Sequence, residues 1–162
     1  MTKRETSAAT NSNAGPRRMG LYQCCIAQYN EALGQGFFIE AVAIAESLIA
    51  DRLESRLAHK HDQSEEKRRF STVGKLATEL NGKKANEPSE AREIYSKIRI
   101  WASERNKAIH QIVKLAENEA PDWGNRYAQA RQIAETGMEL FRNLDKVVSR
   151  LNRRPNHETQ HS

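Results

Sequence analysis

Residues 105–110, Arg-Asn-Lys-Ala-Ile-His, combine the side-chain types that cleavage of a phosphodiester without a metal requires. Arg105 carries a permanent positive charge on a planar fork that can hold two phosphate oxygens. Histidine is the side chain that exchanges protons near neutral pH, so His110 could serve as a general acid or base. The carboxamide of Asn106 could hold the geometry of such a site. The segment therefore predicts phosphate binding and proton transfer.

Arg105 occupies an apolar seam of the long helix that is predicted to carry this segment, from about residue 87 to residue 115. An arginine in such a seam either extends along its edge into solvent or pairs with a carboxylate or an anionic ligand, because an unpaired buried charge is costly. The other members of the seam recur every three or four positions and are Ile94, Ile98, Trp101, Ala108, Ile112 and Leu115.

The spacing within the segment limits what one helix can do. Asn106 and His110 are four residues apart and lie about 40° from each other around an ideal helix, whereas Arg105 and His110 are about 140° apart. One straight helix cannot easily direct Arg105 and His110 at a single phosphate. Either the helix is locally distorted, or two helices combine their faces.

An earlier helix offers a carboxylate for Arg105. Glu46 lies in the middle of an apolar stripe, where a charge is out of place unless it meets a cation. We expect it to contact Arg105, with Asp51 as the second choice. The apolar residues around Glu46 are Val42, Ile49 and Leu53.

Three further cations are candidates for binding substrate. Arg52 and Arg56, one turn apart, could add phosphate contacts; the alternative is a solvated face with Glu–Arg pairs along the helix. Lys107, inside the 105–110 segment, is assigned to the same role. The sequence 59–62, His-Lys-His-Asp, is not a recognised ligand framework, so no metal site is predicted. Trp101 and Trp123 are expected in the core.

Composition and charge indicate one small helical domain with two tails. The chain has 162 residues and a formal net charge of +5. Residues 1–18 hold four basic residues against one acidic residue, a balance of +3, and residues 153–162 contribute +1. Only about +1 is left for residues 19–152, so any nucleic-acid site on the domain should be local. Both tails are polar and aperiodic and are predicted to be disordered.

Helical periodicity without strand-like alternation predicts an all-α fold, an antiparallel four-helix bundle with one short accessory helix. The short helix is expected between caps at Ser71-Thr72 and Asn81-Gly82. The long helices are expected at about 19–33, 37–58, 87–115 and 121–152, with a polar segment at 59–69.

The compartment is predicted from what the sequence contains. Cys24 and Cys25 are adjacent and cannot easily pair with each other, which is typical of a reducing environment. No apolar run approaches the roughly 18–20 residues that span a bilayer, and the N-terminus has no signal-peptide core. We expect a cytoplasmic protein without membrane association.

The pattern Arg-Asn-x-x-x-His near the end of a late helix in a small all-helical chain resembles the HEPN family (higher eukaryotes and prokaryotes nucleotide-binding domains), many members of which are metal-independent ribonucleases. The resemblance implies a homodimer in which two such motifs line a shared cleft. It also implies an acidic residue on an early helix, here Glu46, that orients Arg105. In these roles Arg105 binds the scissile phosphate, His110 transfers protons and Asn106 holds the cleft geometry.

What the resemblance implies about function is RNA cleavage to 2′,3′-cyclic phosphate and 5′-hydroxyl ends, with no cofactor. Such proteins serve as toxins or abortive-infection effectors in antiviral defence, and an antitoxin or regulatory protein is a possible partner. Family toxins that are controlled by a nucleotidyltransferase often carry tyrosine two residues after the histidine. Here that residue is Ile112, so this mode of control is not expected. The alternative is a catalytically inert helical adaptor that binds RNA or protein.

Overall fold

The computed structural model describes residues 14–61, 71–111, 114 and 122–153, and within these ranges all regular structure is helical. The predicted all-α class is confirmed. In chain order the elements are α2 (Ala14–Gln35), α3 (Phe38–His61), α4 (Val73–Asn81), the 3-10 turn η2 (Lys83–Ala85), α5 (Ser89–Gln111) and α6 (Trp123–Asn152). None of the helices in the described ranges combines the length and apolarity needed to cross a membrane.

Some predicted helix boundaries were wrong; α5, for example, ends at Gln111 and not near Leu115. α2 begins at Ala14, so residues 14–18, assigned to the N-terminal tail, are helical. Pro16 is compatible with this start because a proline in the first turn loses no intrahelical hydrogen bond. α3 continues to His61, three residues into the segment predicted to be polar loop. The rest of both predicted tails, 1–13 and 154–162, lies outside the described residues.

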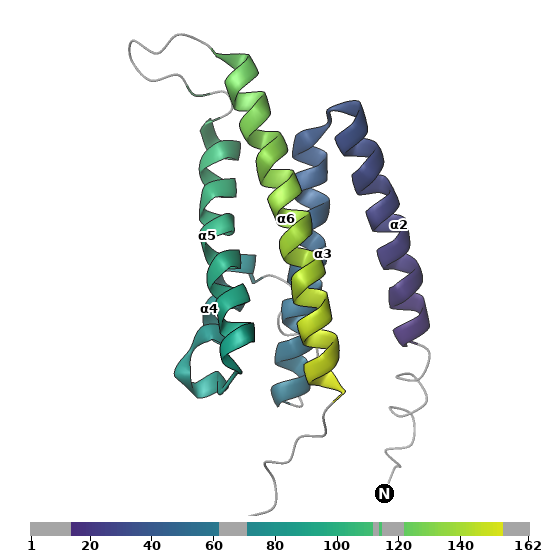
Figure 1. The fold of residues 1–162 in the computed structure, drawn as a ribbon, viewed down its shortest axis with the longest axis vertical. Coiled ribbons are helices and arrows are strands. Elements are labelled where there is room, and N and C mark those ends of the chain that lie inside the picture. The colour runs from purple at the N-terminus through teal and green to yellow at the C-terminus, as the bar shows by residue number, and fades with distance from the viewer. Residues whose placement is uncertain (1–13, 62–70, 112–113, 115–121, 154–162) are drawn as a thin grey trace, which may run out of the picture.

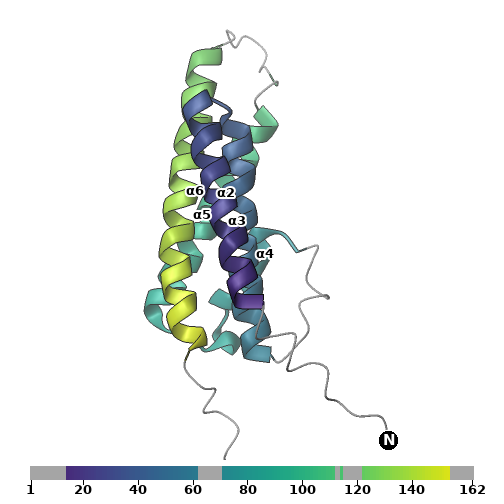
Figure 2. The same ribbon diagram turned by 90° about the vertical axis from the view of Figure 1, so that its right-hand side faces the viewer.

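α3 and α6 pack along each other through the middle of the molecule, with α2 against α3 on one side and α5 against α6 on the other (Figure 1). α4 packs between α3 and α5. Consecutive long helices run in opposite directions, and Figure 2 shows from the side that all four share one long axis. In this arrangement α3 and α5, the helices that carry the predicted site, both pack against α6.

Helix ends follow the sequence signals closely. Thr72 caps α4 through a hydrogen bond from the backbone N–H of Lys75 to its Oγ1 (3.4 Å), and Gly82 follows the last residue. Asp122 caps α6 by accepting a hydrogen bond from the N–H of Asn125 (2.9 Å). These caps satisfy backbone donors that have no partner inside the helix. The predicted start of the last helix and both ends of the short helix are confirmed.

The tight connection between α2 and α3 depends on Gly36, whose φ of 80° lies in the left-handed region that favours glycine. Its N–H donates to the carbonyl of Leu33 (3.2 Å), and the N–H of Phe37 donates to Ala32 (2.8 Å). Tyr127, near the start of α6, donates its hydroxyl hydrogen to the Gly36 carbonyl. This bond fixes the α2–α3 turn against α6.

The centre of the core is built around Trp101, which is 1% exposed as predicted. Its indole N–H donates to the carbonyl of Ile133 (2.9 Å), and its ring lies against Gly137. From the other side of α6, the hydroxyl of Tyr29 donates to the next carbonyl, that of Ala134 (3.0 Å). α2 and α5 are thereby anchored to neighbouring peptide groups of α6, with their polar atoms satisfied inside an apolar core.

Candidate functional site

Glu46 of α3 and Arg105 of α5 form an ion pair and a hydrogen bond in the same chain, between Oε1 and Nη2. The predicted contact is confirmed. The side chain of Arg105 is 16% exposed and that of Glu46 is 29% exposed, so the pair lies at the edge of the core with solvent access on one side. The two charges interrupt facing apolar stripes, and each supplies the partner that the other needs.

Arg105 is only partly satisfied by this contact. Its Nε atom is buried and has no hydrogen-bond partner in the described part of the chain. Glu46 therefore fixes one terminal nitrogen of the guanidinium, while other N–H groups of the fork are not bonded to Glu46. An anion that reached the accessible edge of Arg105 would find a cation already held in position.

Asp51, the second choice as partner, lies elsewhere in the structure. It accepts a hydrogen bond from the hydroxyl of Tyr22 and pairs with Arg18 (3.3 Å), so that it ties the start of α2 to α3. Burial and the neighbouring Asp51 carboxylate both raise the pKa of Tyr22, which keeps the phenol protonated as the donor. Glu46 is thus the carboxylate that positions Arg105.

Asn106 and His110 are exposed on the outer face of α5. Arg99 and Ser103 are exposed as well, and the spacings of four, three and four residues place all four side chains within about 60° of one another. Arg99 was missed in the sequence analysis. The signal that could have found it is this recurrence of polar residues along the face that carries His110.

Arg105 does not lie on this outer face. α5 is α-helical without interruption from Ser89 to Gln111, so the alternative of a local distortion is not observed. Because the helix is regular, Arg105 and His110 stay about 140° apart around its axis. One chain holds Arg105 against Glu46 on an inner side of α5 and presents Asn106 and His110 outward.

Lys107 lies next to this face and lines a polar groove between α5 and α6 with a volume of about 260 Å³. Trp101 and Ile133 form its apolar part. The polar lining consists of Glu104, Lys107, Gln111, Gln129, Gln132 and Thr136.

Arg52 and Arg56, predicted to contact phosphate, are buried and engaged with other elements. Arg52 pairs with Asp145 of α6 (3.0 Å), donates to Ser149 (3.2 Å) and lies over the ring of Tyr22, 5.9 Å from its centroid. The alternative of a solvated face is wrong for both arginines, which are 8% and 7% exposed. The structure does not bring them together with Arg105 and His110.

Arg56 belongs to a buried network that the sequence analysis did not anticipate. Its guanidinium makes two hydrogen bonds to the carboxylate of Glu87 (2.8 and 3.1 Å) and one to Asn152 (3.0 Å). Lys60 pairs with the same carboxylate (2.8 Å), and the hydroxyl of Tyr95 donates to it (2.8 Å). The network joins the end of α3 to the segment that precedes α5 and to the end of α6.

The electrostatics of the network follow from burial and from these bonds. Burial alone raises the pKa of the Glu87 carboxyl, but the hydrogen bonds from Arg56, Lys60 and Tyr95 outweigh it, and the pKa is lowered from its ordinary value. Burial, and then the Glu87 carboxylate, raise the pKa of Tyr95. Glu87 stays ionised and Tyr95 stays protonated, as the hydrogen bonds require. These groups are satisfied by each other and stabilise the fold.

Among the described residues, no group of three or more histidine, cysteine, aspartate or glutamate side chains could hold a metal ion. Within the sequence 59–62, Asp62 and the side chain of His61 lie outside the described part of the chain. Cys24 is exposed, Cys25 is half-buried, and both are free thiols, as expected for adjacent cysteines.

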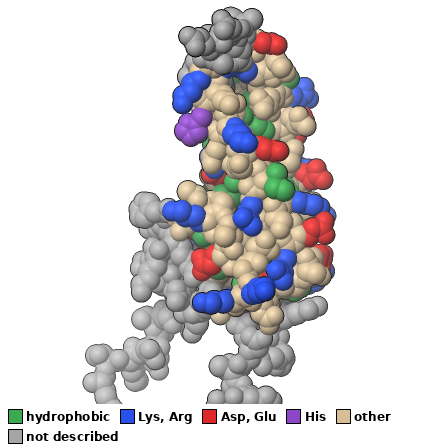
Figure 3. Space-filling model, turned by 90° about the vertical axis from the view of Figure 1, so that its left-hand side faces the viewer, with side chains coloured by type: hydrophobic (Ala, Val, Ile, Leu, Met, Phe, Trp, Pro, Cys, Tyr) green, Lys and Arg blue, Asp and Glu red, His purple; other side chains and the backbone are tan. Residues whose placement is uncertain are grey.

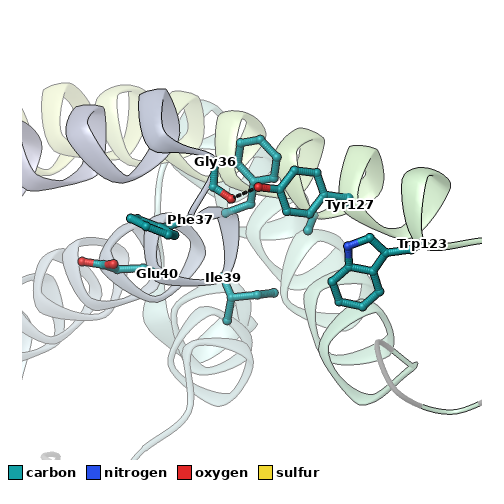
Figure 4. A pocket seen from close by; sticks show the side chains of 8 residues that line it. Gly36, Phe37, Ile39, Glu40, Trp123 and Tyr127 are labelled. Carbon is teal, nitrogen blue, oxygen red and sulfur yellow. Dashed lines mark hydrogen bonds between the residues drawn. The ribbon is translucent and has the colours of Figure 1, made fainter.

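A second hollow is apolar and lies where the α2–α3 turn meets the start of α6 (Figure 4). Its volume is about 360 Å³, and Phe37 and Trp123 beside it are 60% and 59% exposed. The prediction that Trp123 belongs to the core is therefore wrong. The carboxylate of Glu40 points away from Trp123 and accepts a hydrogen bond from Gln28 (3.1 Å), so the hollow itself presents mainly ring and aliphatic surface.

The side of the molecule formed by α4 and α5 carries both signs of charge. Figure 3 shows lysine and arginine side chains interspersed with aspartate and glutamate over this side. A polyanion would meet cations and anions together on this side, and no uniform basic surface.

No family model, curated protein or solved structure matches this chain. A function can therefore be inferred only from the chemistry of these residues.

Proposed function

We propose that this protein is a metal-independent endoribonuclease of the HEPN type, built on a HEPN-like antiparallel four-helix bundle and active as a homodimer. One observation carries the proposal. In the Arg-Asn-x-x-x-His segment, Arg105 is held by Glu46 from an early helix, while Asn106 and His110 stay exposed on α5. A cation fixed by a carboxylate, beside a solvent-accessible proton carrier, suits cleavage of a phosphodiester.

Each residue has a role in the reaction. Arg105 binds the scissile phosphate and stabilises the charge that develops on it, and Glu46 fixes the orientation of its guanidinium. His110 takes the proton of the ribose 2′-hydroxyl as its oxygen attacks phosphorus, or gives a proton to the 5′-oxygen that leaves. The products are a 2′,3′-cyclic phosphate and a 5′-hydroxyl. Asn106 holds the cleft geometry, and Lys107 adds positive charge for substrate binding.

A dimer would bring Arg105 and His110 to one phosphate, which a single helix cannot do. Because Arg105 and His110 are about 140° apart on a regular helix, a single α5 cannot direct both at one phosphate. If the α5 helices of two copies lie beside a two-fold axis, Arg105 of one copy can act with His110 of the other. Ile100 of α5, 61% accessible and about 80° around the axis from His110, is suited to contact with another protein surface.

The decisive experiment measures cleavage of single-stranded RNA in excess EDTA by the protein and by His110→Ala. Cleavage without metal that depends on His110 supports the proposal. Loss of cleavage in EDTA, or a fully active His110→Ala protein, contradicts it. On this proposal the protein acts in the cytoplasm as a toxin or defence effector, and an antitoxin or regulatory protein would restrain it.

A second candidate is a catalytically inert adaptor, and the aromatic hollow at Phe37, Trp123 and Tyr127 favours it. Large exposed rings beside a cavity are typical of a surface that receives apolar side chains of a protein partner. RNA binding without turnover, or normal biological activity of the His110→Ala protein, would favour the adaptor over the enzyme.

A further inference from the structure

The polar groove between α5 and α6 contains hydrogen-bonding groups that the fold does not use. Gln129, Gln132 and Thr136 of α6 make no side-chain hydrogen bond to another described residue, and neither does the side chain of Gln111 on α5. Each carboxamide offers donors and an acceptor, and a hydroxyl offers both. The groove thus presents donors and acceptors together.

Its charge balance excludes a simple phosphate site. Glu104 and Lys107 both line the groove, three residues apart on α5, and they are not within ion-pair distance of each other or of another described residue. A phosphate site would be expected to carry cations and N–H donors alone. A carboxylate, a cation and several amides around one groove instead match a neutral ligand with donors and acceptors on its edge. Nucleobases have this chemistry.

The apolar floor is formed by Trp101 and Ile133, and it is rigid. The indole N–H of Trp101 is already bonded to the Ile133 carbonyl (2.9 Å), so the floor presents no competing donor; Trp101 and Ile133 are 1% and 6% exposed, and recognition therefore falls to the polar side chains around them. A base that entered the groove would place its edge against the side chains of Gln129 and Gln132.

The groove adjoins the proposed reaction site. Lys107 lies three residues before His110 on α5, about 60° around the axis, and Gln111 directly follows His110. A base in the groove would therefore leave its sugar and phosphate beside the outer face that carries Asn106 and His110.

We propose that the α5–α6 groove binds an unpaired nucleobase of the RNA next to the scissile phosphate, with Gln129 and Gln132 reading its edge. This rests on the proposed ribonuclease function, since it assigns a specificity site to the same substrate. Gln129 and Gln132 are positioning and recognition residues and take no part in proton transfer.

The test uses a short single-stranded RNA with 2′-fluoro substitution, which cannot be cleaved, and the same oligonucleotide with one base removed at each position in turn. Binding is measured by fluorescence anisotropy with the full-length protein. Gln129→Ala/Gln132→Ala should weaken binding of the complete oligonucleotide about tenfold, the loss of two hydrogen bonds. It should have no further effect on the oligonucleotide that lacks the recognised base. Gln23→Ala, an exposed carboxamide on α2, is the matched control and should change nothing.

The two proposals fail in different ways. If the double variant weakens every oligonucleotide equally, or none, the groove does not read a base, whether or not natural RNA is cleaved. If the protein shows the base-dependent binding but leaves natural RNA intact, the groove inference stands and the ribonuclease proposal falls. Failure of the unaltered protein to bind the complete oligonucleotide overturns the groove inference.

Discussion

Gly137 lies so close to the indole of Trp101 that a Cβ at position 137 would stand 2.7 Å from Cζ2 of the ring and 3.2 Å from the Cβ of Ala45. α6 therefore approaches α5 and α3 as closely as its backbone permits. The position tolerates glycine alone, although glycine costs a helix interior roughly 0.5–1 kcal/mol relative to alanine. Close packing of Trp101 outweighs that cost.

We expect Gly137→Ala to lower the free energy of unfolding by about 1–3 kcal/mol, the usual range for overpacking a core, measured by urea denaturation. Gly20→Ala on α2 is the matched control, because nothing lies within 4 Å of its added Cβ. That variant should be stabilised by roughly 0.5–1 kcal/mol. Equal effects of the two substitutions would show that Trp101 does not restrict position 137.

Glu46→Ala should reduce both stability and RNA cleavage, because it leaves the largely buried guanidinium of Arg105 without its carboxylate. A loss of about 1–3 kcal/mol in unfolding free energy is expected, as for a hydrogen bond between charged groups. Since Glu46 and Arg105 act together, adding Arg105→Ala should cost less stability in this background than in the parent. Strictly additive losses would mean that the pair is not coupled. Glu135→Ala, which removes an exposed i,i+4 pair with Arg131, is the control and should change stability little.

The lowered pKa of Glu87 predicts how the free energy of unfolding depends on pH. Its pKa is lowered in the folded protein, so the buried network contributes stability that is fully present above the unfolded value near 4.5 and is lost as pH falls through the lower folded value. Glu87→Gln should cost about 3 kcal/mol at pH 7, because Arg56 and Lys60 lose a buried carboxylate. The same variant should lose less further stability than the parent between pH 5 and the acid limit of folding, as followed by urea denaturation at a series of pH values. Parallel pH curves for parent and variant would contradict this role.

The catalytic prediction concerns His110 and Arg105. His110→Ala should lower RNA cleavage by roughly 10²–10⁴-fold, the range for a lost general acid or base, with circular dichroism unchanged. Arg105→Ala should cause a similar loss, whereas Arg92→Ala, an exposed cation on the same helix, should not. DNA should resist cleavage because it lacks the 2′-hydroxyl. Products that end in anything other than a 2′,3′-cyclic phosphate would exclude the mechanism.

The dimer can be tested independently of activity. Light scattering at micromolar concentration should give twice the mass of one chain. Ile100→Glu, which places a charge on the exposed side of α5, should give monomers with unchanged thermal stability of the helices and with cleavage lost. Ile39→Glu, in the hollow on α3, is the control that should remain dimeric. An active monomer would remove the need for a shared cleft.

The parts that the sequence could predict are those with local or paired signals. The ends of α4 follow from Thr72 and Gly82, and the Glu46–Arg105 pair follows because each charge interrupts an apolar stripe. The burial of Arg56 could not be predicted from the sequence in the same way. Its carboxylate, Glu87, precedes a proline and resembles an ordinary helix opening, and only the packing of α3 against the α5 entry brings the two together.

The prediction that Trp123 is buried in the core was wrong for a related reason. The spacing of Trp123 fits a core position, but α6 begins there, and the start of α6 extends past the neighbouring ends of α3 and α5 (Figure 1), which leaves the ring 59% exposed. Periodicity reports which face of a helix is apolar, and it does not report where along the axis the neighbouring helices end.

Two buried hydrogen bonds from neighbouring helices to backbone carbonyls of α6 fix its alignment. Trp101 and Tyr29 approach from different sides and occupy the consecutive carbonyls of Ile133 and Ala134. Moving α6 along its axis by a single residue would translate these acceptors by about 1.5 Å and rotate them by about 100°. Both donors would then lose their partners within an apolar core, and a side chain would replace Gly137 against the indole. The sequence thus specifies one axial register for α6. A variant without both donors, such as Tyr29→Phe with Trp101→Phe, would allow α6 to pack in more than one register.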